Sequence, residues 1–453
     1  MKRLPVVTRS GRKNRVVMLA RYPRLGEVKT RLMPPLTAEK ALALHDRLAR
    51  HTLRSVQALQ ATGEARAEVR TDAAFARVAY DWLGRGFSAR YQGEGDLGDR
   101  IRLAFGESFG RGAERVIVIG SDCPRLTAAH LRDALKRLDG VDMVLGPAED
   151  GGYYLVALGR ERAKESVPVL FSNVEWGTDT VLERTIALCE EHGLTWALLE
   201  RLPDVDRPED LADAEAALAA ATLSPDARIS VVIPALDDAE LVGAAAASAH
   251  AAGAYEVLVV DGGSRDRTRE AAEKAGARVL DASPGRASQM NAGAALAEGD
   301  ILLFLHADTV LPPNAAALAR AALAVPGKEA GAFGFAVARS ARFGRLISAV
   351  GRWRARVTGH PYGDQGLFLS ARTFRDLGGF PDLPTMEDWE FVARLKRLGH
   401  VAVLDEAAVT SARAWEHSGL VRKTASNLAV IWGYRLGIDP ARLARWRRRG
   451  VRR

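Results

Sequence analysis

Short, uninterrupted runs of apolar residues recur along the chain and alternate with segments in which apolar residues return every three or four positions. The first pattern is typical of strands buried on both faces, and the second is typical of helices. This alternation predicts an α/β fold in which helices cover a mostly parallel sheet. In the first half we expect strands at residues 16–20, 67–71, 116–120, 143–146, 154–158 and 195–199, and helices at 38–59, 128–138 and 208–221.

The alternation starts again after a proline-containing segment, 223–226, that is typical of a linker. In the second half we expect strands at 229–233, 257–260, 278–280, 301–305, 331–337, 367–370 and 401–404, and helices at 239–251, 265–275, 286–297, 315–324 and 388–398. The predicted organisation is two tandem Rossmann-like domains at 14–221 and 229–440, a linker at 222–228 and a basic tail at 441–453.

Length and charge add to this picture. A chain of 453 residues exceeds the size at which a single core keeps growing, which favours two domains. The net charge of +8, concentrated in part in the C-terminal arginines, suits phosphate-bearing ligands or anionic surfaces. Nucleic acid is a disfavoured partner because no known nucleic-acid-binding motif accompanies the tail. The tail is either a solvated segment or a contact with anionic lipid.

Two further features indicate the compartment. Two cysteines cannot form a disulfide framework and fit a reducing environment. No stretch approaches the roughly 20 apolar residues of a membrane span. We therefore expect a cytoplasmic protein, with peripheral contact with the inner face of the membrane as an alternative.

Two apolar runs of the second half stop at a carboxylate. Residues 257–260 run into Asp261, and residues 301–305 are followed by Asp308. In open α/β sheets ligands bind beyond the carboxyl ends of the strands, and carboxylates there can hold magnesium or manganese on a phosphorylated ligand. These strand ends predict a site for a nucleotide diphosphate. The alternatives are an ordinary turn at Asp261 and a helix cap at Asp308.

Two predicted helix starts carry complementary chemistry. Arg286 follows a glycine, and both helix N-termini and arginine favour anions such as a diphosphate. Glu387 and Asp388 begin another helix, where a carboxylate is placed to act as a general base. A surface arginine and ordinary first-turn acids are the alternatives.

In this order, the motifs resemble the family 2 glycosyltransferases of GT-A fold over about residues 229–440, with a spelling similar to the arsenosugar-biosynthesis branch. The resemblance lies in residues 232–234 with Glu240, 261–264, 285–291, 306–308 and 387–390. It implies an inverting transfer of a sugar from a nucleotide-diphosphate-sugar donor to the hydroxyl of an acceptor, which is unidentified and includes lipid-linked candidates.

The resemblance also implies roles for single residues. The donor would be bound by Pro234, Glu240, Asp261, Gly263, Ser264, Arg286 and Asp308. Asp308 would also hold a divalent metal, magnesium or manganese, and Asp388, with Glu387 beside it, would deprotonate the acceptor. The usual first acid of the metal motif is His306 here, so metal binding would rest on Asp308 alone.

Two segments near this motif set keep two interpretations each. Asp364 and Gln365 either contact the acceptor or form a turn, and residues 415–418 either close over the donor or have no role there.

The first half places basic and acidic residues at its own strand ends. Lys29 and Arg31 follow the first strand in a glycine-containing loop that can cradle phosphates, although it is not a Walker A sequence. Asp122 follows the strand at 116–120 and can take the metal role, while Cys123 is interpreted as a small buried residue.

Residues 14–215 resemble a GT-A-like family of unassigned function, of the DUF2064 type, which is related to nucleotidyltransferases. The resemblance implies that Lys29 and Arg31 hold phosphates and Asp122 a metal, so that this domain makes or binds the activated sugar. Nucleotidyl transfer and binding without turnover both remain open. For the whole chain, the rival to the glycosyltransferase hypothesis is a non-catalytic nucleotide- or sugar-binding protein. The central expectation is that Asp261, Arg286, Asp308 and Asp388 converge on one cleft.

Overall fold

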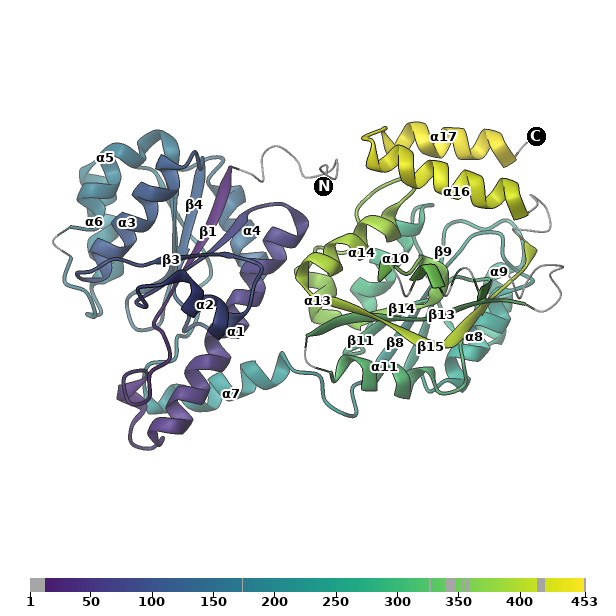
Figure 1. Cartoon of the computed structure of the whole chain (residues 1–453), viewed down its shortest axis with the longest axis horizontal. Coiled ribbons are helices and arrows are strands. Elements are labelled where there is room, and N and C mark those ends of the chain that lie inside the picture. The colour runs from purple at the N-terminus through teal and green to yellow at the C-terminus, as the bar shows by residue number, and fades with distance from the viewer. Residues whose placement is uncertain are drawn as a thin grey trace. The chain divides into compact units, whose positions relative to one another are not determined.

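The computed structural model describes residues 13–451 except 173, 326, 339–347, 350, 352, 356, 357 and 414–419 (Figure 1). The chain divides into two compact units, the first ending at Thr222 and the second beginning at Leu223. Each unit is a mostly parallel sheet with helices between its strands, so the predicted fold class is confirmed.

The first unit builds a seven-stranded sheet in the order β3-β2-β1-β4-β6-β5-β7. The pairings among the described strands are parallel except for those of β6. Its strands are β1 (Asn14–Ala20), β2 (Arg66–Thr71), β3 (Ser88–Tyr91), β4 (Arg115–Ile119), β5 (Met143–Pro147), β6 (Tyr153–Gly159) and β7 (Trp196–Leu198). Its helices are α1 (Ala38–Thr62), α2 (Ala76–Leu83), α3 (Leu97–Gly110), α4 (Ala128–Arg137), α5 (Arg160–Leu170), α6 (Val181–Glu191) and α7 (Leu211–Ala220).

Strand β1 shows why the central strands read as continuous apolar runs. Successive side chains point to opposite faces of the sheet, and both faces are covered. Val16 and Met18 pack in the core formed with α1 and α4, whereas Val17 packs in the core formed with α3, α5 and α6. The pattern did not predict β3, because Ser88–Tyr91 is a largely exposed edge strand with no apolar run.

The second unit repeats this topology and adds one short strand. Its sheet has the order β10-β9-β8-β11-β14-β13-β15-β12, in which β14 takes the antiparallel place that β6 has in the first unit. Its strands are β8 (Ile229–Ala235), β9 (Glu256–Asp261), β10 (Arg278–Asp281), β11 (Ile301–Phe304), β12 (Thr309–Val310), β13 (Lys328–Val337), β14 (Leu367–Ser370) and β15 (His400–Thr410).

Helices cover both faces of the second sheet. They are α8 (Val242–Ala251), α9 (Thr268–Lys274), α10 (Arg286–Leu296), α11 (Ala315–Leu323), α13 (Ala371–Asp376), α14 (Glu387–Leu398), α16 (Leu420–Arg435) and α17 (Pro440–Val451). Helices α8 and α11 share a core with one face of β8. Helix α10 lies against β8 and β9 so closely that a Cβ at Gly293 would come within 2.5 Å of a Val232 methyl.

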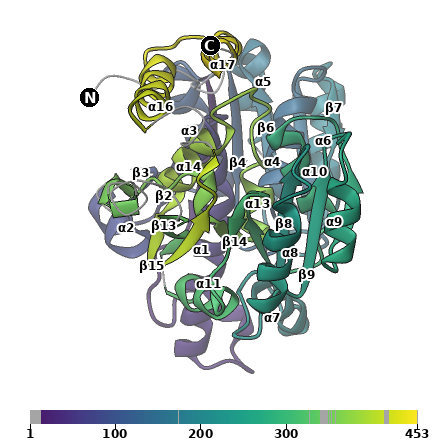
Figure 2. The ribbon, with the colours of Figure 1, turned by 90° about the vertical axis from the view of Figure 1, so that its right-hand side faces the viewer.

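The C-terminal helices form a satellite layer. Helices α16 and α17 lie side by side and pack on α14 through Trp389, Tyr434 and Leu443 (Figures 1 and 2). The segment predicted as a basic tail is thus helical up to Val451, with Leu443 buried and with Arg442 and Arg445 exposed. Among the described helices, none combines the length and the apolar character that a bilayer crossing requires.

Two predicted helix starts were three residues too early. Helix α8 begins at Val242 rather than at 239, and α9 begins at Thr268 rather than at 265. The residues before them are held in turns, because Asp238 N–H donates to the Thr268 hydroxyl and Ala239 N–H donates to Asp266. Side chains that bind nearby backbone groups compete with helix formation in this way.

Candidate functional site

The turn after β9 is organised by Asp261, whose residue is only 2% exposed. Its carboxylate accepts N–H bonds from Gly263 at 3.2 Å and from Ser264 at 3.1 Å, and it receives the Ser264 hydroxyl. Gly263 has φ +94°, a left-handed conformation that favours glycine. Three of the residues predicted to bind the sugar donor, Asp261, Gly263 and Ser264, therefore form one rigid turn at a strand end. The Asp261 carboxylate is already hydrogen-bonded within this turn.

The loop after β8 is braced against this turn. Asp237 N–H donates to the Ser264 hydroxyl at 2.9 Å, and Arg265 N–H donates to Asp237 at 2.8 Å. Asp238 also pairs with Arg413, which follows β15, at 3.0 Å. Two further residues were predicted to bind the nucleotide-sugar donor. Pro234 is buried within β8, and Glu240 is exposed on this loop.

Helix α10 directs its N-terminus toward the same strand ends. Gln289, one turn into the helix, donates its side-chain N–H groups to the carbonyls of Ala235 and Val260, each at 2.8 Å. These bonds fix the start of α10 beside the ends of β8 and β9. Arg286 is the first residue of the helix and is exposed, so its guanidinium and the helix N-terminus present positive charge together.

Three segments meet at Gly363. Asp388, at the start of α14, accepts the Gly363 N–H at 2.9 Å through Oδ2. A Cβ at Gly363 would come within 2.8 Å of His306 Nε2 and 3.0 Å of Asp388 Oδ2. The segment after β11, the short 3-10 turn Gly363–Gln365 and the start of α14 therefore place His306 and Asp388 against the same residue, Gly363.

Asp364 interacts electrostatically with Arg354, Asp388, Asp308 and Arg286. One of its carboxylate oxygens is buried and finds no hydrogen-bond partner among the described residues. The pKa of Asp364 is raised to about 6, chiefly by burial and also by Asp388 and Asp308, whereas Arg354 and Arg286 oppose the increase. The structure therefore brings the predicted residues Asp308, Asp388 and Arg286 within electrostatic range of one carboxylate.

Two ionisable residues near this cluster, Arg354 and His360, were not predicted from the sequence. Arg354 lies 3.2 Å from the centre of the Tyr362 ring and donates to the His360 carbonyl at 3.2 Å. Burial lowers the pKa of Arg354, and the nearby Tyr362 and Asp364 oppose that effect. Burial also lowers the pKa of His360 to about 4, so this ring is neutral at pH 7. Arg354 lies among several arginines in the sequence, so nothing in the local pattern distinguished it as a site residue.

Glu387 and Asp388 differ in accessibility. Glu387 is buried, whereas Asp388 is partly exposed. Of the two predicted catalytic acids, Asp388 is the one placed to meet a ligand. Residues 415–418, for which closure over the donor was considered, lie outside the described part of the chain.

The acids of this site fit a divalent metal. Asp308 and Asp364 supply carboxylate oxygens, which magnesium and manganese prefer, and the buried Asp364 oxygen lacks a partner in the described structure. No group of three His, Cys, Asp or Glu side chains in the described ranges is arranged as a ready-made metal site. This arrangement suits an ion held by one or two carboxylates together with ligand phosphates.

The first unit contains a cavity of about 750 Å³, lined by residues that include Lys29, Arg31, Gln92, Arg100, Asp122 and Asp206. Lys29 Nζ lies 3.0 Å from Asp122 Oδ2 and also donates to the Val205 carbonyl, and its side chain is 4% exposed. Arg31 pairs with Asp206. The residues predicted to hold phosphate and metal thus line one cavity and are paired within it.

Charge balance differs between the acids around this cavity. Burial would raise the pKa of Asp122, but the Lys29 ammonium, helped by His45, outweighs burial and holds that pKa below its usual range. The pKa of Asp204 is raised to about 6, chiefly by burial and also by Asp150 and Asp206. Burial also raises the pKa of Cys123 to about 12, which agrees with the prediction of an inert buried thiol.

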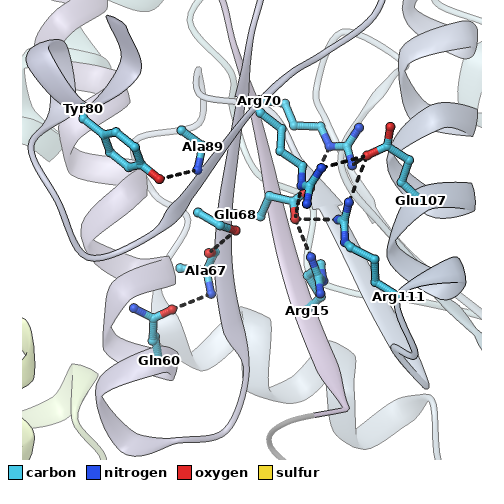
Figure 3. A network of polar contacts seen from close by, with 11 residues as sticks. Arg15, Gln60, Ala67, Glu68, Arg70, Tyr80, Ala89, Glu107 and Arg111 are labelled. Carbon is cyan, nitrogen blue, oxygen red and sulfur yellow. Dashed lines mark hydrogen bonds and ion pairs between the residues drawn. The ribbon is translucent and has the colours of Figure 1, made fainter. Parts of the chain in front are cut away.

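A buried ion network fixes α3, which carries part of the cavity wall (Figure 3). Glu68 on β2 binds Arg15, Arg70 at 2.8 Å and Arg111 at 2.7 Å. Glu107 on α3 accepts from Arg70 and Arg111, each at 2.9 Å. Glu68 and Arg70 are fully buried, and a buried charge without a partner of opposite charge would strongly destabilise the fold.

Two protein-family models match the chain. Residues 53–178 match the family described as "Uncharacterized protein conserved in bacteria (DUF2064)", and residues 230–343 match "Glycosyl transferase family 2". No curated protein matches the chain. The arsenosugar branch is not distinguished by these matches and stays a prediction.

Solved structures similar to part of the chain include a protein from Desulfovibrio desulfuricans G20 classed as a nucleotide-diphospho-sugar transferase. It is 26% identical, with a TM-score of 0.39, over 46% of this chain and 97% of that one. Glucosyl-3-phosphoglycerate synthase from Mycobacterium tuberculosis is 22% identical, with a TM-score of 0.34, over 45% and 79%. TarS from S. aureus is 15% identical, with a TM-score of 0.33, over 45% and 64%.

The two family matches fall in different structural units, one on each side of the boundary at Thr222. The C-terminal unit therefore contains a glycosyltransferase domain of family 2, joined in one chain to an N-terminal domain of the DUF2064 family.

Proposed function

We propose that the C-terminal unit transfers a sugar from a nucleotide-diphosphate sugar to an acceptor hydroxyl, with inversion at the sugar carbon. The observation that carries this proposal is that Arg286, Asp308 and Asp388 all act electrostatically on Asp364, while Asp388 also accepts the N–H of the neighbouring Gly363 at 2.9 Å. It combines an anion-binding group, a metal-binding acid and a partly exposed base. The match of residues 230–343 to the glycosyltransferase family supports the same reaction class.

The donor diphosphate binds at the start of α10. Arg286 is exposed there, and the first turn of an eleven-residue helix leaves backbone N–H groups for an anion. The nucleoside lies along the braced loops after β8 and β9, whose turn positions Gly263 and Ser264. As the bond to the sugar breaks, negative charge grows on the leaving diphosphate, and Arg286 stabilises it.

Asp388 acts as the general base. Its Oδ2 is oriented by the Gly363 N–H at 2.9 Å and its Oδ1 by the Trp389 N–H at 2.7 Å, which leaves lone pairs on both oxygens for an acceptor hydroxyl. Removing the hydroxyl proton lets the oxygen attack the sugar carbon from the side opposite the diphosphate. A single displacement of this kind inverts the configuration.

Asp308, together with Asp364, would hold a divalent metal. When bound, such an ion neutralises charge on the diphosphate oxygens.

Nucleoside diphosphate release from a panel of nucleotide-sugars tests this proposal. Wild type is expected to release the diphosphate from at least one donor, and Asp388→Asn is expected to bind the same donor without turning it over. A protein that turns over no member of the panel, or a variant as active as wild type, would support the non-catalytic binding function instead.

For the N-terminal unit we propose a phosphate-bearing ligand, so that this unit makes or binds the activated sugar that the second unit uses. The cavity that contains Lys29, Arg31 and Asp122 supports this role. Wild type and Asp122→Ala, incubated with sugar phosphates and nucleoside triphosphates, distinguish synthesis from binding. Donor formation by wild type alone indicates nucleotidyl transfer, and equal formation by both proteins contradicts it.

A further inference from the structure

The cavity of the first unit contains a buried amide that nothing in the described protein binds. Gln92 follows β3, lines the cavity and is 2% exposed. Its backbone N–H donates to the Thr71 carbonyl at 2.9 Å, but its side-chain nitrogen is buried and finds no acceptor among the described residues. A buried donor without an acceptor destabilises the folded protein, so a ligand acceptor at this position is favoured.

The turn that carries Gln92 has a fixed conformation. Gly93 and Gly95 both have φ +89°, which favours glycine. A Cβ at Gly95 would come within 2.1 Å of an Asp99 oxygen, so the turn lies directly on the start of α3. Glu107, at the other end of α3, is held by the network around Glu68. The turn at Gly93 and Gly95 and the anchored helix α3 therefore hold the Gln92 amide in place before a ligand binds.

The charges around this turn favour an uncharged acceptor. Asp96 caps α3 by accepting the Asp99 N–H at 2.8 Å, and Asp99 accepts the Asp96 N–H at 3.1 Å. These two carboxylates neutralise the helix N-terminus, which otherwise attracts phosphate. Arg100 adds a second donor, because its Nε is buried without a partner in the described structure, and its one positive charge is outnumbered by the two carboxylates. A carbonyl oxygen suits this wall better than a phosphate group does.

The remainder of the cavity favours an anion. Lys29 and Arg31 are paired with Asp122 and Asp206, and the lining as a whole keeps one excess positive charge, from Arg21, Lys29, Arg31 and Arg100 against Asp96, Asp122 and Asp206. A volume of about 750 Å³ is in the usual range for sites that bind ligands of nucleotide size. The ligand that satisfies both parts carries phosphate at one end and an uncharged carbonyl group at the other.

We propose that this cavity binds a nucleoside phosphate whose base bears a carbonyl oxygen, and that the Gln92 side chain donates to that oxygen. The inference rests on the phosphate-binding role proposed above for the first unit and extends it to the identity of the base. Gln92 is thus a specificity-determining residue: with its side-chain nitrogen held in the buried position, a base with an amino group in place of the carbonyl leaves that nitrogen unpaired. Sites built to donate to a ligand oxygen reject ligands that lack it.

Inosine and adenosine triphosphates provide a matched pair of probes, because they differ in a carbonyl or an amino group at position 6 of the purine. Equilibrium dialysis is done with the full chain carrying Arg286→Ala, which weakens the proposed nucleotide site of the second unit. We expect inosine triphosphate to bind about fivefold to tenfold tighter than adenosine triphosphate. Gln92→Leu is expected to abolish this ratio, and Gln92→Glu, which replaces the donor with an acceptor, is expected to reverse it.

Gln57→Leu is the matched control, because the Gln57 side chain donates to the Arg85 carbonyl and does not line the cavity. This variant is expected to keep the wild-type ratio. The ratio of two affinities in one protein is insensitive to partial loss of folded material. Equal affinities in wild type, or a ratio that Gln92→Leu leaves unchanged, would overturn the inference.

Inorganic tripolyphosphate separates the two levels of the proposal. If it competes for the cavity while the two nucleotides bind equally, the phosphate-binding role stands and the role of Gln92 is wrong. If neither nucleotide nor tripolyphosphate binds, both are wrong.

Discussion

The two units share one strand order but treat the acids at their strand ends in opposite ways. Asp122 after β4 is paired with Lys29 at 3.0 Å, so the first unit balances its own acid. Asp308 follows the equivalent strand β11 and lies in electrostatic range of Asp364, whose buried oxygen has no partner in the described structure. The same topology therefore yields one site whose acid is neutralised by the protein and another that needs a ligand or cation to neutralise it.

Two glutamines near the corresponding helices α10 and α3 also differ in whether the protein itself satisfies their hydrogen-bond donors. Gln289 lies in α10, which follows β10, and its side-chain N–H groups donate to two strand-end carbonyls. Gln92 lies between β3 and α3, before the helix that corresponds to α10, and its side-chain nitrogen has no partner among the described residues. Gln289 therefore holds structure in the second unit, whereas the amide of the first unit is available to a ligand. The same residue type near corresponding helix starts therefore has different roles in the two units.

The largest expected effect separates the two acidic sites by turnover. Asp388→Asn removes the proposed base, and loss of a general base typically lowers turnover by about 10²–10⁴-fold. Asp122→Ala, in the other unit, is expected to leave transfer from a supplied donor unchanged. Steady-state rates of nucleoside diphosphate release measure both, and Asp382→Asn, an exposed acid just before α14, is the control. Equal losses in the two units would contradict the division of roles.

The buried network is expected to make the first unit depend strongly on one carboxylate. Glu68→Gln leaves Arg15, Arg70 and Arg111 without their shared acid, and breaking a buried ion pair costs about 3–5 kcal/mol. Chemical denaturation followed by circular dichroism measures the loss in free energy of unfolding. Glu165→Gln, an exposed acid on α5, should change it by less than about 0.5 kcal/mol. A Glu68 variant as stable as that control would show that the network is dispensable.

A smaller effect is expected for the arginine at the start of α10. Arg286→Ala is expected to weaken binding of the nucleoside diphosphate by about 2 kcal/mol, roughly thirtyfold, because it removes a hydrogen bond between charged groups. The exposed Arg278 on β10 provides the matched control. Titration calorimetry measures the affinities. If Arg278→Ala has the same effect, general attraction by positive charge explains binding and Arg286 has no specific role.

The smallest expected effect is the pH dependence caused by Asp364. Its pKa is about 6 in the folded protein and near 4 when unfolded, so the folded state binds more protons in that window and its stability falls as pH rises from about 4 to 6. Asp364→Asn removes this dependence, and at pH 7 it should be more stable than wild type, because a neutral amide avoids the cost of a buried charge. Thermal unfolding at pH 4 and pH 7 checks the sign, and a variant less stable than wild type at pH 7 would contradict it.

The central parts of both sheets were predictable because buried strands leave continuous apolar runs, as at β1, β4, β8 and β11. Edge strands such as β3 were not, since an exposed strand has no such run. The ends of the buried strands also predicted Asp122, Asp261 and Asp308 as boundary residues.

Contacts between side chains that are far apart in the chain could not be predicted from the sequence. The contact between Lys29 and Asp122 joins residues 93 positions apart in the chain, and nothing local to either residue indicates it. Arg354 and Gln92 were missed for a related reason: their significance depends on burial and on which neighbours lack partners. Asp364 was noticed, but a glycine-flanked acid is equally typical of a turn, and only its unpartnered oxygen distinguishes it.

A double-mutant cycle of Arg286→Ala and Asp308→Asn, with nucleoside diphosphate affinity as the readout, tests most directly whether these groups act on one ligand in one cleft. We expect the two effects to be coupled by at least about 1 kcal/mol, because both groups act on the same diphosphate. Effects that add to within about 0.5 kcal/mol would show that the two side chains act independently, and would contradict the convergent site.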